Sequence, residues 1–231
     1  MKCEEYMELL WEQYKLISVL SNKNGAKVLR VRHKALDRDV IVRQYSSLIH
    51  AYEQLKNLYH KNLPEILESL PCQDGHIVLE EYINGISVAD VAGSYTYSGA
   101  KAVILGVCNA VHSLHALKII HRDIKPENVM ISSDGTVKLI DLNASRMPKR
   151  KDKDTVMLGT IGYAAPEQLG ISESDERSDI YAIGVLLNVM LTGQHPSSCL
   201  ATGKAGKIVQ KCTMIAPDSR FHSAQELMQA L

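Results

Sequence analysis

One eight-residue segment constrains this chain more than any other part of it: His121-Arg-Asp-Ile-Lys-Pro-Glu-Asn128. It follows the long apolar stretch Ala100–Leu117, whose pattern predicts a buried helix. It precedes two short β-branched runs, Val129–Ile131 and Val137–Ile140, and the intervening Ser132–Gly135 predicts a hairpin turn. The segment is therefore expected to form a loop that is held rigidly between a helix and a hairpin.

The polar residues of this loop suit phosphoryl transfer. Asp123 supplies a carboxylate that can orient a hydroxyl group and accept its proton, and Lys125 supplies a cation for the moving phosphoryl charge. Asn128 and Asp141, which ends the hairpin, supply oxygens that can hold Mg²⁺. Each residue alone would fit an ordinary polar surface loop, whereas the ordered set indicates an active site.

Composition argues against several other classes of protein. The 231 residues include 26 basic and 26 acidic side chains, and a formal net charge of zero argues against nucleic-acid binding. An apolar content of 45% excludes a disordered chain. The five cysteines are widely spaced, so we predict no metal site or disulfide framework and expect a cytoplasmic protein. The longest apolar stretch, Tyr181–Leu191, predicts a buried helix that is too short to span a membrane.

The character of the chain changes near residue 84. The region before it predicts strands around one helix, Ser47–Tyr59, and the region after it is mainly helical. The predicted strands of the first region are Leu16–Leu20, Lys27–His33, Asp39–Tyr45, Glu65–Leu70 and His76–Ile83. We therefore expect a β-rich first lobe and a helical second lobe.

With these motifs the chain resembles the eukaryotic-type Ser/Thr protein kinases that are also found in bacteria, over essentially its whole length. Asp123 matches the catalytic-loop aspartate, Lys125 the lysine typical of Ser/Thr kinases, and Asn128 the metal-binding asparagine. Asp141-Leu-Asn143 stands where the family has Asp-Phe-Gly. Gly159–Glu167 resembles the end of an activation segment, including its Ala-Pro-Glu motif.

The resemblance implies a bilobal α+β fold in which residues 1–231 form a single protein kinase domain. A small β-rich N-terminal lobe is expected at about 1–83, and a larger, mainly helical C-terminal lobe at about 84–231. The implied cofactors are ATP and Mg²⁺. The implied partner is a protein substrate or a regulatory protein, with no nucleic acid and no membrane span.

The resemblance also assigns roles to individual residues. The catalytic residues are Asp123 and Lys125, the metal ligands are Asn128 and Asp141, and the nucleotide-binding residues are Val28, Arg43, Glu81 and Ile83.

Other matches to the family are expected to be structural. Asp179 corresponds to a buried aspartate that holds the backbone of the catalytic loop, and Arg220 to the partner of Glu167. His121 is expected to orient the loop rather than to catalyse. Thr160 is expected either to bond the catalytic aspartate and lysine, which we favour, or to cap a turn.

The nucleotide-binding half departs from the family pattern. A kinase phosphate loop carries three glycines, so that backbone N–H groups can approach the phosphates without a Cβ atom in the way. When the chain is aligned on Val28, those positions hold Ser21, Lys23 and Ala26, and Gly25 lies one residue out of register. Such a loop is expected to stand further from the phosphates or to leave them uncovered.

Arg43 stands at the position of the family's strand lysine, where it keeps the charge with a bulkier planar group. The helix position that supplies the glutamate partner holds Ala51. Glu53, two residues further on, reaches Arg43 only if the helix is rotated or shifted. Lys27 or Lys23 is a candidate substitute lysine, and Lys27 would face the nucleotide only after a one-residue slip of its strand.

Three further substitutions affect the site. Glu80 occupies a usually apolar position at the back of the adenine pocket, and a buried carboxylate there needs a partner, either Arg43 or the adenine amino group. Leu142 replaces the phenylalanine of the metal-binding motif with another apolar side chain. Asn143 replaces its glycine, and asparagine is the next-best residue for a left-handed backbone.

The favoured function is an active Mg·ATP-dependent Ser/Thr kinase, because the catalytic and metal-binding residues are present. The alternative is a pseudokinase that acts as a binding or allosteric scaffold, which Arg43, Ala51 and the lost glycines favour. A third, weaker hypothesis is a small-molecule phosphotransferase. It is weaker because Gly159–Glu167 resembles a segment that forms a peptide-docking shelf, which such enzymes lack.

Overall fold

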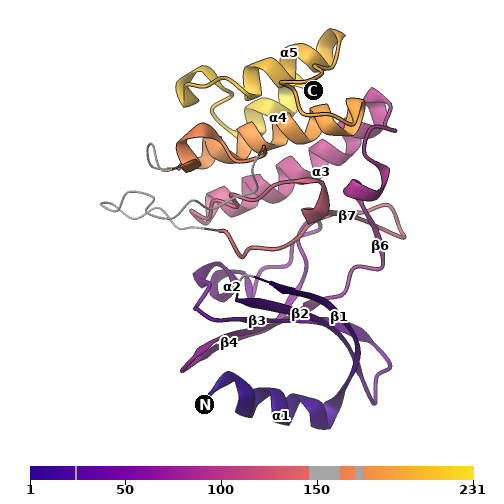
Figure 1. The fold of residues 1–231 in the computed structure, drawn as a ribbon, viewed down its shortest axis with the longest axis vertical. Helices are drawn as coiled ribbons and strands as arrows, with labels where there is room; N and C mark the ends of the chain where they lie inside the picture. The colour runs from indigo at the N-terminus through magenta and orange to yellow at the C-terminus, as the bar shows by residue number, and fades with distance from the viewer. Residues whose placement is uncertain (24, 146–161, 170–173) are drawn as a thin grey trace. The chain divides into compact units, whose positions relative to one another are not determined.

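The computed structural model of the chain describes residues 1–23, 25–145, 162–169 and 174–231. They cluster into two compact units. The first unit comprises Met1–His60 and Pro64–Ile83, and the second comprises Lys61–Leu63 and Asn84–Leu231. The first is built on a β-sheet and the second mainly on helices, as Figure 1 shows, so the expected α+β class is confirmed.

A five-stranded antiparallel sheet forms the centre of the first unit, with the strand order β1-β2-β3-β5-β4. Its strands are β1 (Tyr14–Lys23), β2 (Ala26–His33), β3 (Asp39–Tyr45), β4 (Ile66–Cys72) and β5 (Gly75–Glu81). All five predicted strands are therefore present, and the first is longer than predicted.

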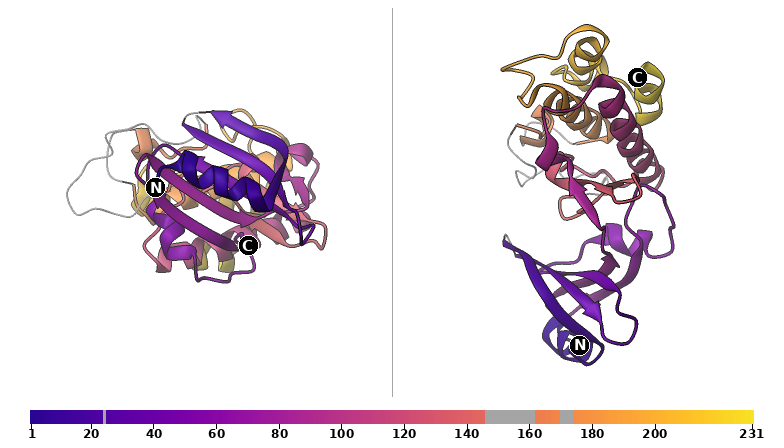
Figure 2. Two further views of the ribbon diagram at one scale, coloured as in Figure 1. Left: turned by 90° about the horizontal axis from the view of Figure 1, so that it is seen from below. Right: turned by 90° about the vertical axis from the view of Figure 1, so that its right-hand side faces the viewer.

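Helix α1 (Cys3–Gln13) runs across one face of this sheet (Figure 2). Its buried residues Cys3, Met7 and Leu10 lie three or four positions apart and form one apolar stripe. They pack against alternate residues of the central strands, namely Leu29, Val31, Val40, Val42, Ile77 and Leu79. The sequence pattern predicts only one helix before residue 84, Ser47–Tyr59, so α1 is a second helix that was not predicted. Its short apolar stripe is stable as a helix because the sheet buries it.

Helix α2 (His50–Leu55) packs against β4, and its apolar residues Ala51, Tyr52 and Leu55 are buried. The predicted bounds, Ser47–Tyr59, are wrong at both ends. The helix has no side-chain N-cap, and a helix this short depends on tertiary packing rather than on its own propensity.

The second unit combines helices with a small three-stranded sheet of order β6-β7-β8. The strands are β6 (Gly85–Ser87), β7 (Val129–Ser132) and β8 (Val137–Leu139). The α-helices are α3 (Tyr97–Ala116), α4 (Glu176–Thr192), α5 (Gly203–Cys212) and α6 (Ala224–Ala230). Short 3-10 helices lie at η1 (Val88–Val91), η2 (Pro126–Asn128), η3 (Pro166–Leu169) and η4 (Pro217–Ser219). The predicted hairpin is confirmed, and Gly135 provides the positive φ of its turn.

Helix α4 is the central element of the second unit. It is buried nearly all round and packs against α3 and α5 (Figure 1). It begins after Asp175, whose side chain accepts a hydrogen bond from the Arg177 N–H at 2.8 Å. The helix predicted at Tyr181–Leu191 is confirmed as its apolar part. In the described part of the chain, no helix is long and apolar enough to cross a membrane.

The close approach of α4 and α5 generates a stability prediction. A Cβ atom added at Gly184 would lie 2.3 Å from the Cβ of Cys212. Replacing Gly184 by Ala is therefore expected to push the helices apart and lower the free energy of unfolding by about 1–3 kcal/mol. Chemical denaturation measures this change.

Gly99→Ala provides the matched control on α3. The nearest atom to its added Cβ is 3.4 Å away, an ordinary contact, so the variant should be at least as stable as the natural chain. Equal stability of the two variants would contradict the tight packing of α4 on α5.

Candidate active site

The carboxylate of Asp179 on α4 holds the backbone of the His121–Asn128 loop. It accepts hydrogen bonds from the N–H groups of His121 at 2.9 Å and Arg122 at 2.8 Å. It also pairs with Nε2 of His115 at 2.8 Å. Burial acts to raise the pKa of Asp179, but these hydrogen bonds and the adjacent histidines outweigh it and keep the pKa below its ordinary value. The structural role predicted for Asp179 is confirmed.

His121 lies inside the loop and is fully buried. Its Nδ1 accepts a hydrogen bond from the Asp123 N–H at 3.4 Å, so its Nε2 carries the proton and donates to the Ile140 carbonyl at 3.2 Å. The ring thereby links the loop to the end of β8. This geometry confirms that His121 orients the loop.

Two non-glycine residues of this region have a positive φ, Arg122 at +68° and Asp141 at +67°. Backbone of this kind is costly for residues with a Cβ atom and tends to concentrate at functional sites. Hydrogen bonds help to hold the backbone at Arg122. The buried side chain of Gln168 donates to the Arg122 carbonyl at 2.9 Å and accepts from the Ala165 N–H at 3.0 Å. Gln168 was not predicted as a site residue, since a glutamine after a short motif is ordinarily an exposed residue.

Three polar side chains converge within the loop. The Lys125 ammonium lies 2.8 Å from Oδ2 of Asp123. The side-chain amide of Asn128 donates to the same oxygen at 3.0 Å and to the Asp123 carbonyl at 2.8 Å. Because the nitrogen of this amide is used in both bonds, its oxygen is the atom suited to a metal ion. The side chains of Asp123 and Lys125 remain 16% and 20% exposed, so ligands can reach them.

Asp141 follows Ile140, whose backbone is hydrogen-bonded to both ends of the His121–Asn128 loop. The N–H of Ile140 donates to the Asn128 carbonyl at 2.9 Å, and its carbonyl accepts from His121. These bonds bring Asp141 close to Asn128 in the second unit. The carboxylate and the amide oxygen are hard donors of the kind that Mg²⁺ takes together with phosphate oxygens and water, so the residues fit this ion.

The activation-segment motif is anchored by a buried ion pair. Arg220 donates from both terminal nitrogens to the Glu167 carboxylate, at 2.7 and 2.9 Å, and Ser178 donates to it at 2.8 Å. Burial acts to raise the pKa of Glu167, but these donors hold it below its ordinary value. The predicted pairing is confirmed. Gly159 and Thr160 lie outside the described residues.

In the first unit, Arg43 on β3 and Glu80 on β5 form a buried ion pair. Nε of Arg43 donates to Oε1 of Glu80 at 2.6 Å, and their side chains are 6% and 3% exposed. Of the two partners considered for Glu80, Arg43 is the one observed. The Arg43–Glu53 pairing is not formed, because Glu53 accepts a hydrogen bond from Ser69 instead.

Strand register decides between the candidate substitute lysines. Val28 lies opposite Arg43, so both point to the same face of the sheet. Lys27 lies opposite Gln44 and points to the other face, so the strand slip that it needs does not occur. Lys23 pairs with Ala26 at the end of the hairpin and shares the face of Arg43.

The β1–β2 hairpin ends in a tight turn rather than in an open glycine-rich loop. Lys23 pairs with Ala26, so two residues connect the strands. Gly25 has a φ of +73°, and its carbonyl accepts the Ser46 N–H at 3.1 Å. This hydrogen bond joins Gly25 to the residue that follows β3.

The two remaining predicted nucleotide-binding residues lie at the end of the first unit. Glu81 is the last residue of β5, and its side chain accepts a hydrogen bond from the Glu65 N–H at 3.1 Å. Ile83 is buried and is the last residue of the unit.

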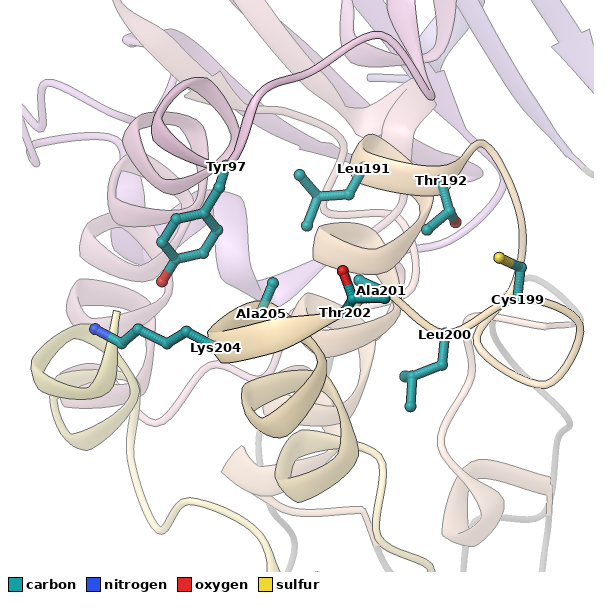
Figure 3. A pocket seen from close by; sticks show the side chains of 9 residues that line it. All are labelled: Tyr97, Leu191, Thr192, Cys199, Leu200, Ala201, Thr202, Lys204 and Ala205. Carbon is teal, nitrogen blue, oxygen red and sulfur yellow. The ribbon is translucent and has the colours of Figure 1, made fainter.

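A separate cavity of about 510 Å³ lies in the second unit, between the end of α4 and the start of α5 (Figure 3). It is lined by Tyr97, Leu191, Thr192, Cys199, Leu200, Ala201, Thr202, Lys204 and Ala205. Lys204 donates to the Leu231 carbonyl at 2.9 Å. No carboxylate is among these residues, so the cavity lacks groups of the kind that Asp123 and Asp141 supply.

The Glu167–Arg220 pair generates a prediction for stability. Arg220→Met leaves the Glu167 carboxylate buried without its cation, and we expect the free energy of unfolding to fall by about 3–5 kcal/mol. The double variant Glu167→Met with Arg220→Met removes both charges and should regain part of that loss. Chemical denaturation of both variants tests this. A double variant no more stable than Arg220→Met would contradict a burial penalty on the unpaired carboxylate.

Comparison with known proteins identifies the family. The model of the protein kinase domain matches residues 17–230. The chain is 32% identical over 158 residues to an Aurora kinase of Candida glabrata, covering 68% of this chain and 44% of the relative. It is 30% identical to the serine/threonine-protein kinase PknB of Mycobacterium tuberculosis, covering 81% of this chain and 33% of the relative. A probable serine/threonine-protein kinase of Clostridium perfringens is 26% identical over 82% of this chain and 30% of its own length.

The chain spans less than half the length of these curated relatives. The family model nevertheless covers nearly all of it, from the β1 strand to the last helix. The match includes the loop that Asp179 holds, the segment that ends in Asp141 and the Glu167–Arg220 pair. The chain belongs to the protein kinase domain family.

Proposed function

We propose that this chain is a Mg·ATP-dependent serine/threonine protein kinase domain, which transfers the γ-phosphoryl group of ATP to a hydroxyl group of a protein. The observation that carries the proposal is the convergence of Asp123, Lys125 and Asn128 on a loop fixed by buried Asp179. The names of the bacterial relatives, which are serine/threonine kinases, support the same substrate class. A cytoplasmic location stays a prediction.

Each catalytic side chain has a distinct role in this proposal. The Asp123 carboxylate orients the substrate hydroxyl and accepts its proton as the oxygen attacks phosphorus. The Lys125 ammonium, already 2.8 Å from that carboxylate, stabilises the negative charge that develops on the phosphoryl oxygens. Asn128 and Asp141 are the proposed ligands of Mg²⁺, which when bound neutralises charge on the phosphate oxygens.

The first unit supplies the proposed nucleotide-binding residues. Arg43 provides a cation for the phosphates, and Val28 provides an apolar surface on the same face of the sheet. Glu81 and Ile83, at the end of the unit, provide backbone hydrogen-bonding groups for the base.

The second candidate function is a pseudokinase that acts as a binding or allosteric scaffold. Two observations favour it, the tight β1–β2 turn at Gly25 and the arginine at the strand-lysine position. Phosphoryl transfer depends almost entirely on positioning and charge stabilisation, so the loss of phosphate positioning removes several orders of magnitude in rate.

Single-turnover transfer from γ-labelled ATP separates the two candidates. The natural chain is expected to label itself or a generic basic protein on serine or threonine in the presence of Mg²⁺. Asp123→Asn keeps the shape of the loop but removes the proton acceptor, so the rate should fall by about 10²–10⁴-fold. Nucleotide binding without measurable transfer by the natural chain would support the scaffold function instead.

The metal assignment generates its own prediction. Asn128→Leu removes the amide oxygen proposed to bind Mg²⁺, so half-maximal activity should require about tenfold more Mg²⁺. A titration of transfer rate against Mg²⁺ measures the change. His222→Leu, on an exposed residue of the second unit, is the control and should leave the Mg²⁺ requirement unchanged. An unchanged requirement in Asn128→Leu would contradict the assignment.

A further inference from the structure

Two separate polar networks occupy one face of the sheet in the first unit. One is the ion pair of Arg43 with Glu80, which joins the adjacent strands β3 and β5. The other joins Glu53 of helix α2 to Ser69 of β4 and His76 of β5. Arg43, Glu80, Ser69 and His76 are buried, whereas the side chain of Glu53 is 40% exposed.

The first network is fixed by the sheet itself. Arg43 pairs with Val78 across the strands, and Glu80 pairs with Ile41, two positions along in an uninterrupted register. The two side chains therefore point to the same face and meet diagonally. Because β3 and β5 lie inside the five-stranded sheet, their ladder of backbone hydrogen bonds sets the position of the Glu80 carboxylate.

The second network uses the carboxylate that α2 carries. Ser69 donates its hydroxyl hydrogen to Glu53, and Nε2 of His76 lies 2.8 Å from the same hydroxyl. Nδ1 of His76 accepts the N–H of Ile49, at the start of the helix, at 3.2 Å. Burial lowers the pKa of His76, which favours the neutral ring that this acceptor role needs. The helix is thus attached to the sheet through Ser69 and His76, away from Arg43.

The contrast between the networks assigns a role to Glu80. We propose that Glu80 is the positioning residue of Arg43, so that the nucleotide-directed cation of this kinase is held by a carboxylate of the sheet and not by the carboxylate of helix α2. This inference rests on the proposed function, in which Arg43 binds the phosphates of ATP. The Glu80 carboxylate belongs to a strand paired with that of the cation, whereas Glu53 is carried by a separate six-residue helix.

The proposal predicts opposite behaviour for two matched substitutions in the whole chain. Glu80→Gln keeps the shape of the side chain and removes its charge, which should raise the KM for Mg·ATP about tenfold with a smaller effect on kcat. Glu53→Gln makes the same chemical change on α2 and should alter this KM by less than about twofold. Both are measured at a temperature where circular dichroism shows that the variants are folded.

A second pair of variants separates positioning from folding. Arg43→Leu combined with Glu80→Leu removes both buried charges and avoids an unpaired one, so it should fold. Its KM for Mg·ATP should equal that of Arg43→Leu alone, because the proposal has Glu80 affect nucleotide binding through Arg43. Glu80→Asp keeps the charge and should recover most of the KM lost in Glu80→Gln.

Three results would overturn the inference. In the first, Glu53→Gln raises the KM for Mg·ATP as much as Glu80→Gln does. In the second, Glu80→Gln leaves this KM unchanged. In the third, Glu80→Leu raises the KM further when Arg43 is already leucine. If the proposed function is wrong, the result is different: the natural chain itself neither binds nor uses Mg·ATP. That result also contradicts the role proposed for Glu80.

Discussion

The buried carboxylate of Asp179 is the interaction on which the arrangement of the second unit depends. A charge in the interior of a protein is stable only when it is well bonded, and here the donors are the N–H groups of the catalytic loop and His115. The same bonds support a backbone with positive φ at Arg122. Helix α4 is itself buried nearly all round, so it gives this carboxylate a rigid base. The positions of Asp123, Lys125 and Asn128 follow from that support.

The two units differ in how they relate to the family pattern. The second unit holds the side chains that we propose as proton acceptor, cation and metal ligands, and short polar contacts bring Asp123, Lys125 and Asn128 together. The first unit has a tight hairpin turn at Gly25 and a strand arginine paired with Glu80. Phosphoryl transfer depends on positioning together with charge stabilisation, so these departures in the first unit are what favours the scaffold function as the alternative.

Sequence patterns predicted the parts of the structure that depend on local spacing. The catalytic loop, the hairpin after it and the buried helix α4 are confirmed, because motif and periodicity lie in contiguous residues. The sequence alone allows two partners for Glu80, Arg43 and the adenine amino group, since a diagonal contact depends on strand register. Helix α1 and the length of α2 were missed because the sheet stabilises both. Gln168 was missed because its role depends on long-range contacts.

Thermal melting of the natural chain with ATP, with and without Mg²⁺, is the most direct test of the central claim that this domain holds Mg·ATP. Binding to the folded state alone raises the melting temperature by mass action. We expect a rise at millimolar nucleotide that requires Mg²⁺ and that is smaller in Asp141→Asn. An unchanged melting temperature at millimolar Mg·ATP would show that the domain does not hold Mg·ATP.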